Sequence, residues 1–261
     1  MRVITLTTDF GSQDWFVGTM KGVILGVNPK ATLVDITHEI PPGDIRAGAF
    51  ALMSSYRFFP KGTVHVAVVD PGVGSERKAI AVQTANYTFV GPDNGVLSFA
   101  LANEKITDVR QLENNKYFLN PVSHTFHGRD IFAPIAAHLS GGVAVSNLGP
   151  KQKHIIQLPW PRPEISRNRI SGEVIYVDRF GNAITNILNT CLAGMKEAEV
   201  FIAGKRACRV KPFYQSVPAG KAVAVPGSSG FLEIAVNGGS AAQSLGIKIG
   251  NTLTIRKVVA G

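Results

Sequence analysis

Cysteine and charge are scarce in this chain of 261 residues, and each scarcity excludes a class of protein. Cys191 and Cys208 are the two cysteines, too few for the disulfide framework of a small secreted domain. Charged residues make up only 17% of a chain that is 45% hydrophobic, which indicates a globular protein and excludes a disordered one. We expect both cysteines to be buried thiols in a reducing compartment.

Long apolar runs and clustered charges are also missing. No stretch reaches the roughly 18 apolar residues of a membrane span, and residues 1–6 are typical of a strand, with no apolar leader before it. The net charge is +9, but Lys and Arg are scattered with no run of five, which favours a solvated basic face over a nucleic-acid surface. We therefore predict a cytoplasmic protein that binds neither membrane nor nucleic acid.

Strands and helices alternate in the first part of the chain, which predicts an α/β domain with a largely parallel sheet and helices on both faces. Residues 63–69 form a continuous apolar run, as in a strand buried on both sides. The ranges 79–84 and 87–90 have the pattern of a hairpin or of neighbouring strands. The other expected strands are 3–8, 31–35 and 106–109, and the expected helices are 15–27, 44–58, 95–102 and 129–139.

The pattern changes at residues 158–163, where three prolines in five residues suit neither a helix nor a central strand. We predict an α/β domain over residues 1–157 and a smaller all-β, barrel-like domain over residues 165–261. Glycine and proline turns separate the short strands of the second domain. These strands are expected at 172–178, 183–187, 198–203, 207–210, 222–225, 231–236 and 252–257.

Two carboxylates directly follow predicted strands of the first domain. Asp9 and Asp70 would lie at the carboxyl edge of the sheet, where such folds bind ligands. Asp9 could accept from the vicinal hydroxyls of a ribose, or could simply cap the helix that follows. Asp70 begins a glycine-rich turn that can fold Arg77 back towards it. That pair could orient a small nucleophile or form a structural salt bridge.

His127 precedes a predicted helix, whose first turn carries partial positive charge. A histidine there tends to stay neutral and could act as a base or a hydrogen-bond acceptor, although a capping or core-edge role is the more common case. His124 is the nearest alternative base. No cysteine or acidic pair completes a metal site with the two histidines, and no Gly-x-Gly-x-x-Gly opens the first helix.

A second group of polar and aromatic residues lies in the predicted β domain. Phe180 could stack on a base and Asn182 could pair with a purine edge, although residues 178–182 also suit an ordinary hairpin turn. Ser228 belongs to a glycine-bounded turn that could present N–H groups and hydroxyls to a carboxylate, ahead of a strand that holds Glu233.

In this order the segments resemble the S-adenosyl-L-methionine (SAM) hydroxide adenosyltransferase family, which hydrolyses SAM and has fluorinase and chlorinase as halide-using relatives. The resemblance runs over nearly the whole chain. Its carriers are Thr7-Thr8-Asp9-Phe10-Gly11, Asp70-Pro71-Gly72-Val73-Gly74 with Arg77, Pro92-Asp93-Asn94-Gly95, Phe126-His127-Gly128-Arg129-Asp130 and Asp178-Arg179-Phe180-Gly181-Asn182.

The resemblance implies a water-activating trio of Asp70, Arg77 and His127, which the halogenating relatives lack. It also implies a homotrimer that binds SAM between neighbouring subunits and uses no cofactor. The expected substrate contacts are Asp9 at the ribose, Asp14 and Asp178 at the ammonium, Asn182, Phe180 and the backbone near Val236 at adenine, Ser228 at the carboxylate, and Glu233 in a less defined place.

The resemblance predicts hydrolysis of SAM to adenosine and L-methionine by in-line attack of water or hydroxide on ribose C5′. Two alternatives remain open: a SAM- or adenosine-binding sensor with negligible turnover, and a SAM-dependent 5′-halogenase. A sensor would have no need of the trio. A halogenase is disfavoured by the trio and by the absence of a long fluorinase-type insertion between residues 31 and 90.

Overall fold

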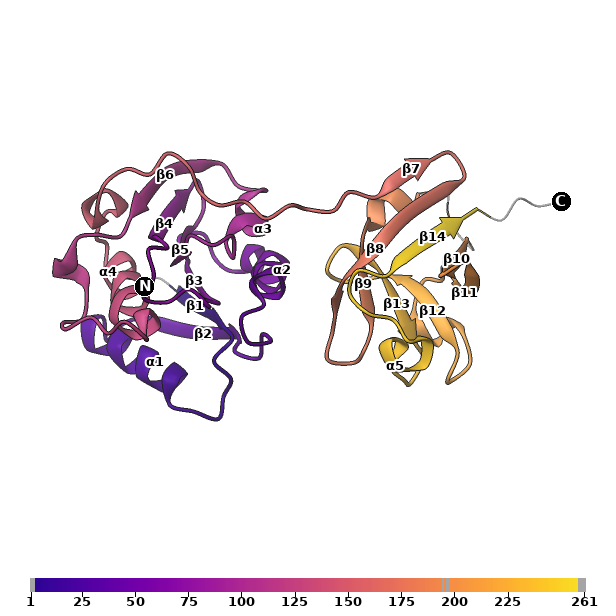
Figure 1. The fold of residues 1–261 in the computed structure, drawn as a ribbon, viewed down its shortest axis with the longest axis horizontal. Coiled ribbons are helices and arrows are strands. Elements are labelled where there is room, and N and C mark those ends of the chain that lie inside the picture. The colour runs from indigo at the N-terminus through magenta and orange to yellow at the C-terminus, as the bar shows by residue number, and fades with distance from the viewer. Residues whose placement is uncertain (1–2, 194, 196–197, 258–261) are drawn as a thin grey trace. The chain divides into compact units, whose positions relative to one another are not determined.

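The computed structural model describes residues 3–193, 195 and 198–257. The chain forms two compact units that divide between Pro159 and Trp160, within the proline-rich segment (Figure 1). No helix in the described part of the chain combines the length and apolar character needed to cross a membrane.

The first unit is built on a six-stranded sheet of order β2-β1-β3-β5-β4-β6. Strand β1 runs parallel to β2 and β3, and β3 runs parallel to β5, whereas β4 is antiparallel to both β5 and β6. The predicted α/β class and the predicted hairpin are therefore confirmed. The strands are β1 (Val3–Thr8), β2 (Thr32–Thr37), β3 (Val64–Val68), β4 (Ala79–Thr84), β5 (Thr88–Pro92) and β6 (Ile106–Gln111).

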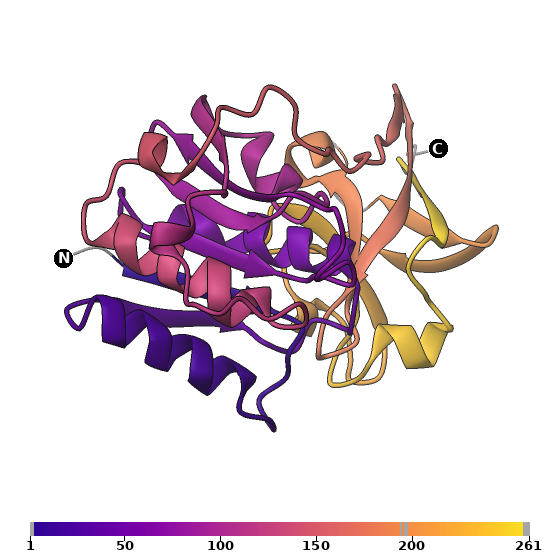
Figure 2. The same cartoon turned by 60° about the vertical axis from the view of Figure 1, so that its left-hand side comes forward.

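Helices cover both faces of this sheet (Figure 2). Helices α1 (Phe16–Val27) and α4 (Ala133–Ser140) pack together on one face, where Met20, Ile24 and Ile135 join Ile4 and Leu6 of β1 in the core. Helix α2 (Ile45–Ser55) lies on the other face with the short α3 (Ser98–Leu101). Short 3₁₀ segments are Tyr56–Phe58, Asn115–Tyr117 and Val145–Leu148.

The predicted helix over 129–139 is wrong in its first turn. Residues Gly128–Phe132 form a π-helix that continues into α4. The carbonyl of Phe126 accepts from the N–H groups of both Arg129 and Asp130, at 3.2 and 3.1 Å. The Asp130 carboxylate is fully buried and accepts from Arg129 Nε at 2.6 Å and from the Ser123 backbone at 2.8 Å. These contacts hold the irregular turn that begins at His127.

The second unit is a nearly closed antiparallel barrel of strand order β11-β10-β14-β8-β9-β13-β12, with β7 paired to β8. A parallel bridge between Val210 and Ala224 links its two outer strands, and the barrel-like prediction is confirmed. Its elements are β7 (Glu164–Ser166), β8 (Arg169–Val177), β9 (Ala183–Leu188), β10 (Glu199–Ile202), β11 (Lys205–Arg209), β12 (Ala222–Pro226), β13 (Phe231–Val236), α5 (Ala241–Leu245) and β14 (Thr252–Arg256), with 3₁₀ segments at Asn189–Leu192 and Tyr214–Ser216.

The two cysteines are free thiols. Cys208 is buried among apolar side chains, and burial raises the pKa of its thiol to about 12. Cys191 is only partly buried, so the prediction of two buried thiols is correct for Cys208 alone.

Candidate active site

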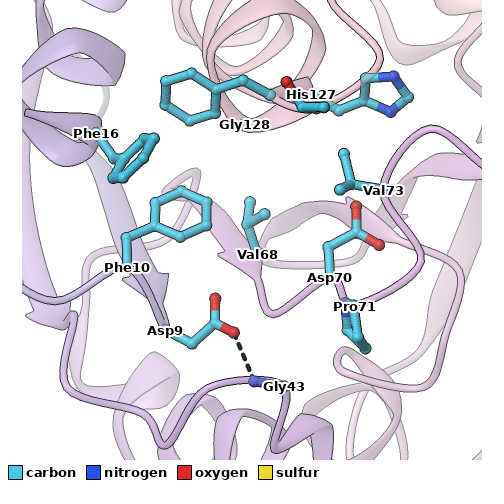
Figure 3. Close-up of a pocket in the computed structure, with 12 residues that line it drawn as sticks. Asp9, Phe10, Phe16, Gly43, Val68, Asp70, Pro71, Val73, His127 and Gly128 are labelled. Carbon is cyan, nitrogen blue, oxygen red and sulfur yellow. Dashed lines mark hydrogen bonds between the residues drawn. The ribbon is translucent and has the colours of Figure 1, made fainter.

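A pocket of about 340 Å³ opens in the first unit where β1 and β3 end (Figure 3). This is the carboxyl edge at which parallel sheets commonly bind ligands, since their connecting loops converge there. Its lining includes Asp9, Phe10, Val68, Asp70 and His127. Segments that are far apart in the sequence therefore meet around one cavity.

The predicted trio converges at this pocket. Arg77 donates from Nε to both carboxylate oxygens of Asp70, at 3.0 and 2.9 Å, and from Nη2 to Oδ2 at 2.5 Å. The same Nη2 lies 2.7 Å from Nδ1 of His127, which is 50 positions away in the chain. The Asp70 side chain is only 4% exposed and that of Arg77 only 11%, so the pair is largely shielded from water. Arg77 thus joins the acid to the imidazole.

This geometry assigns the tautomer of His127. A guanidinium has donors and no acceptor, so Nδ1 of His127 must accept and Nε2 must carry the proton of the neutral ring. Burial, reinforced by the charge of Arg77, holds the pKa of His127 below its ordinary value of 6.5. Near neutral pH the imidazole therefore offers one N–H donor, at Nε2, beyond its contact with Arg77.

Glycine allows the turn that carries Asp70 and Arg77 to lie against the loop that leads to His127. Gly74 has φ +77°, and a Cβ there would lie 2.2 Å from the backbone carbonyl oxygen of His124. No side chain fits in that gap, and the backbone conformation itself disfavours L-residues. The close approach of these two segments explains how the turn Asp70-Pro71-Gly72-Val73-Gly74 can lie next to a histidine that is distant in the sequence.

Asp9 also lines this pocket and does not cap α1, whose N-cap is Trp15. Its Oδ2 accepts from the Gly43 backbone at 2.8 Å, the contact drawn in Figure 3. Asp9 thus keeps Oδ1 for another donor and is not the helix cap that the sequence also allowed. Asp14 is exposed in the loop before α1 and falls outside the described lining of this pocket.

An aromatic wall was not predicted. The rings of Phe10, Phe16 and Phe126 contact one another with centroids 5.1–5.9 Å apart, and all three line the pocket. A Cβ on Gly128 would come within 3.1–3.2 Å of Phe126 and Phe10, so the glycine leaves room for them. Aromatic faces attract cations, including sulfonium-type ones. The signal was present in the sequence, because Phe10 and Phe126 each adjoin a predicted site residue.

A second pocket, of about 820 Å³, lies in the barrel unit. Phe213 and Tyr214, which sequence reasoning missed, extend its aromatic lining from the start of the 3₁₀ segment Tyr214–Ser216. The described lining contains two carboxylates and no Lys or Arg, which gives it a negative character within a basic protein. Six predicted substrate contacts line it together: Asp178, Phe180, Asn182, Ser228, Glu233 and Val236.

Hydrogen bonds within this pocket orient its polar groups. Asp178 Oδ1 accepts from the backbone N–H groups of Phe180 and Asn182, both at 2.9 Å, and Oδ2 accepts from Asn182 Nδ2 at 3.0 Å. The predicted hairpin turn is present, with Gly181 at φ +79°. Glu233 is 95% buried, since only 5% of it is exposed, and accepts from the Tyr214 hydroxyl at 2.6 Å. Burial raises the pKa of Glu233, whereas the bond from Tyr214 lowers it.

Known proteins resemble this chain over nearly its full length. A protein of Thermus thermophilus named (R)-S-adenosyl-L-methionine hydrolase is 40% identical over 259 residues, which cover 96% of this chain and 98% of the relative. The hydrolase of the same name from Salinispora arenicola is 38% identical over 255 residues, 97% of each chain. A fluorinase from Actinoplanes is more distant, with 26% identity over 290 residues.

The fold and the family descriptions agree with these relatives. The crystal structure of an uncharacterized conserved protein from Thermotoga maritima superposes with a TM-score of 0.92 at 38% identity, covering 97% of this chain and 99% of that one. The SAM hydroxide adenosyltransferase N-terminal domain matches residues 4–149, and the C-terminal domain of the same family matches residues 172–254. This chain therefore belongs to the SAM hydroxide adenosyltransferase family.

Proposed function

We propose that this protein hydrolyses SAM to adenosine and L-methionine. The observation that carries the proposal is the meeting of Asp70, Arg77 and His127 at one pocket, in a chain about 40% identical to named SAM hydrolases. A sensor that only binds SAM would have no need of a buried acid, guanidinium and imidazole joined by hydrogen bonds.

The leaving group explains why the site needs no strong acid. Water or hydroxide attacks C5′ of the ribose, the new O–C5′ bond forms as the C5′–S bond breaks, and the electron pair goes to sulfur. Methionine leaves as a neutral thioether and takes no proton. Attack of an anion on a sulfonium also cancels charge, which a dry pocket favours.

The trio binds the water or hydroxide that acts as the nucleophile and holds it in position. Because Nδ1 of His127 already accepts from Arg77, the imidazole donates from Nε2 to the oxygen of the nucleophile, which favours its hydroxide form. The second proton of water is released to solvent or taken by Asp70. Holding the oxygen in line with C5′ can lower the barrier by about 7–11 kcal/mol in favourable systems.

The remaining predicted contacts each bind a different part of the substrate. We propose that Asp9 binds the ribose hydroxyls and that Asn182, Phe180 and the backbone near Val236 bind adenine. Asp178 would face the ammonium. Ser228 would receive the carboxylate, Glu233 and Asp14 would add negative charge for the cationic methionine portion, and the aromatic wall would face the sulfonium. The family resemblance supports a homotrimer that binds SAM between subunits, and the two cysteines, read as thiols of a reducing compartment, support a cytoplasmic location.

We propose no cofactor, with SAM itself as the substrate. The (R) prefix in the names of the relatives supports a preference for the epimer of SAM with R configuration at sulfur. Separate assays with each purified epimer measure this preference as a ratio of kcat/KM.

Labelled water provides the test of the reaction. The protein is incubated with SAM in ¹⁸O-water, with and without excess chloride, and the nucleoside is identified by mass spectrometry. Adenosine carrying ¹⁸O in its 5′-hydroxyl is expected. Formation of 5′-chloro-5′-deoxyadenosine would assign a halogenase, and tight SAM binding without product would assign a sensor.

A further inference from the structure

The segment Pro92-Asp93-Asn94-Gly95 has no role in the chemistry above, yet it touches both ends of the turn that carries the acid and the guanidinium. Asp70 and Arg77 stand at the first and eighth positions of that turn. We propose that Asn94 is a positioning residue, which holds the start of the turn in place and so sets the geometry between Asp70, Arg77 and His127.

Asn94 fixes the residue that precedes Asp70. Its Nδ2 donates to the backbone carbonyl of Val69 at 2.8 Å, while its Oδ1 accepts from the backbone N–H of Val96 at 3.1 Å. The Val69 carbonyl belongs to the peptide unit whose nitrogen is that of Asp70. One side chain therefore fixes the plane of the peptide from which the acid of the trio projects.

Asp93 fixes the residue that follows Arg77. Its backbone N–H donates to the carbonyl of Lys78 at 2.8 Å, and its buried carboxylate accepts from the backbone N–H of Ile156 at 2.8 Å. The two neighbours Asp93 and Asn94 thus hold both ends of the turn. On its far side the turn closely approaches the carbonyl of His124 at Gly74, where a Cβ would not fit.

Close packing leaves this segment little freedom. A Cβ on Gly91 would lie 2.4 Å from the carbonyl oxygen of Ala67, and a Cβ on Gly95 would lie 2.6 Å from Leu158. Gly95 also has φ +99°, a conformation that favours glycine. A rigid support of this kind matters because a displacement of about 1 Å at a catalytic group can cost about 100-fold in rate.

The inference rests on the proposed function, and Asn114 offers a matched control. Asn114 Nδ2 donates to the Asn147 carbonyl at 2.8 Å and its Oδ1 accepts from the N–H two residues on, at 3.3 Å, the same pattern as Asn94 at a place away from the pocket. The isosteric Asn94→Asp removes the donor to Val69 and keeps the acceptor. The other variants to be compared are Asn94→Ala, Asn114→Asp and Asn114→Ala.

For SAM hydrolysis we expect Asn94→Asp to lower kcat by about 10- to 100-fold while KM changes by less than about twofold. The Asn114 variants should retain the kcat of the wild type. Equal kcat losses in the Asn94 and Asn114 variants, or an Asn94→Asp enzyme with wild-type kcat, would overturn the inference. If Asn94→Asp does not fold, Asn94→Ala replaces it in the same comparison.

A second measurement does not depend on turnover. In ¹⁵N-histidine-labelled protein, the alanine variants add no charge, so displacement of Arg77 should remove one cause of the lowered pKa of His127; this pKa should rise in Asn94→Ala and stay constant in Asn114→Ala. An unchanged His127 titration would overturn the positioning role. Wild-type protein that fails to hydrolyse SAM would refute the proposed function, while the titration would still decide the role of Asn94.

Discussion

Arg77 donates from Nη2 to Nδ1 of His127 across 2.7 Å, while its Nε binds Asp70. The bridge fixes which nitrogen of the imidazole carries the proton, and it does so through a group that cannot accept one. A histidine held in this way acts first as a donor. That property separates the proposed mechanism from one in which His127 is the general base, and it leads to the first two predictions.

Arg77→Lys should lower kcat about 10²- to 10³-fold, because an ammonium cannot reach both Asp70 and His127 with the planar fork of a guanidinium. The KM for SAM should change little. Arg110→Lys is the control, since Arg110 Nε binds Asp108 at 2.9 Å in a pair outside the pocket lining. Steady-state kinetics of adenosine release measure both variants, and comparable losses in the two would contradict the bridging role.

His127→Gln should retain at least about tenfold more activity than His127→Ala, because the amide nitrogen of glutamine can donate where Nε2–H does. If His127 instead acted as the base that removes a proton, glutamine would be as inactive as alanine. Single-turnover rates with saturating SAM, compared for the two variants, distinguish these outcomes.

The pH dependence of kcat/KM should follow the ionisation of His127 in the free enzyme. The pKa of His127 is lowered, so activity should be full above that pKa and be lost as the pH falls through it, below the ordinary value of 6.5. Protonation of Nδ1 would turn the acceptor into a donor facing a guanidinium. An acid limb centred above pH 6.5 in the wild type would contradict this assignment.

Tyr214→Phe should raise the KM for SAM by about 2- to 13-fold, which corresponds to the roughly 0.5–1.5 kcal/mol of one hydrogen bond. Tyr214 lowers the pKa of Glu233 against the effect of burial, so its loss should raise that pKa further. As the pH is lowered, SAM binding by Tyr214→Phe should therefore begin to weaken at a higher pH than SAM binding by the wild type. Tyr117→Phe serves as the control. If the KM for SAM depends on pH in the same way in the wild type and in Tyr214→Phe, Glu233 is excluded as a charged contact of SAM.

His65 should make the first unit sensitive to acid. It is fully buried beside Tyr56 and Phe89, and burial lowers its pKa to about 3. The unfolded chain binds a proton at about 6.5, so stability should be full above that pH and fall by at most about 1.4 kcal/mol per pH unit below it. Urea unfolding between pH 4.5 and 7 measures the slope. His65→Leu should reduce the slope of stability against pH, whatever the substitution does to stability at neutral pH.

The convergence of the first pocket could be predicted in outline. Asp9 and Asp70 directly follow strands that the sequence shows clearly, and parallel strands end on one edge of a sheet. The spacing of Asp70 and Arg77 also made a local pair plausible. The link from Arg77 to His127 was expected only from the family resemblance, because spacing along the chain carries no information about a contact across 50 positions.

Short or irregular elements escaped the sequence patterns for a physical reason. Strand β7 has three residues and helix α5 has five, fewer than periodicity needs to be recognised. The π-helix at Gly128–Phe132 depends on the buried Asp130 and its partners from outside the helix, which hydrophobic spacing does not encode. Tyr214 likewise lies in the barrel pocket through its contact with Glu233, and no sequence motif marks it.

The turn at Asp178 has a consequence for which nucleoside the barrel pocket admits. One Nδ2 proton of Asn182 is donated to Asp178, which fixes the orientation of the amide and leaves its oxygen as an acceptor for a ligand. If this oxygen faces the base, as the proposed adenine contact requires, it would accept from the exocyclic amine of adenine and repel the carbonyl of hypoxanthine. Under the proposed adenine contact, Asp178 would therefore disfavour the deaminated counterpart of SAM through the orientation that it gives to Asn182.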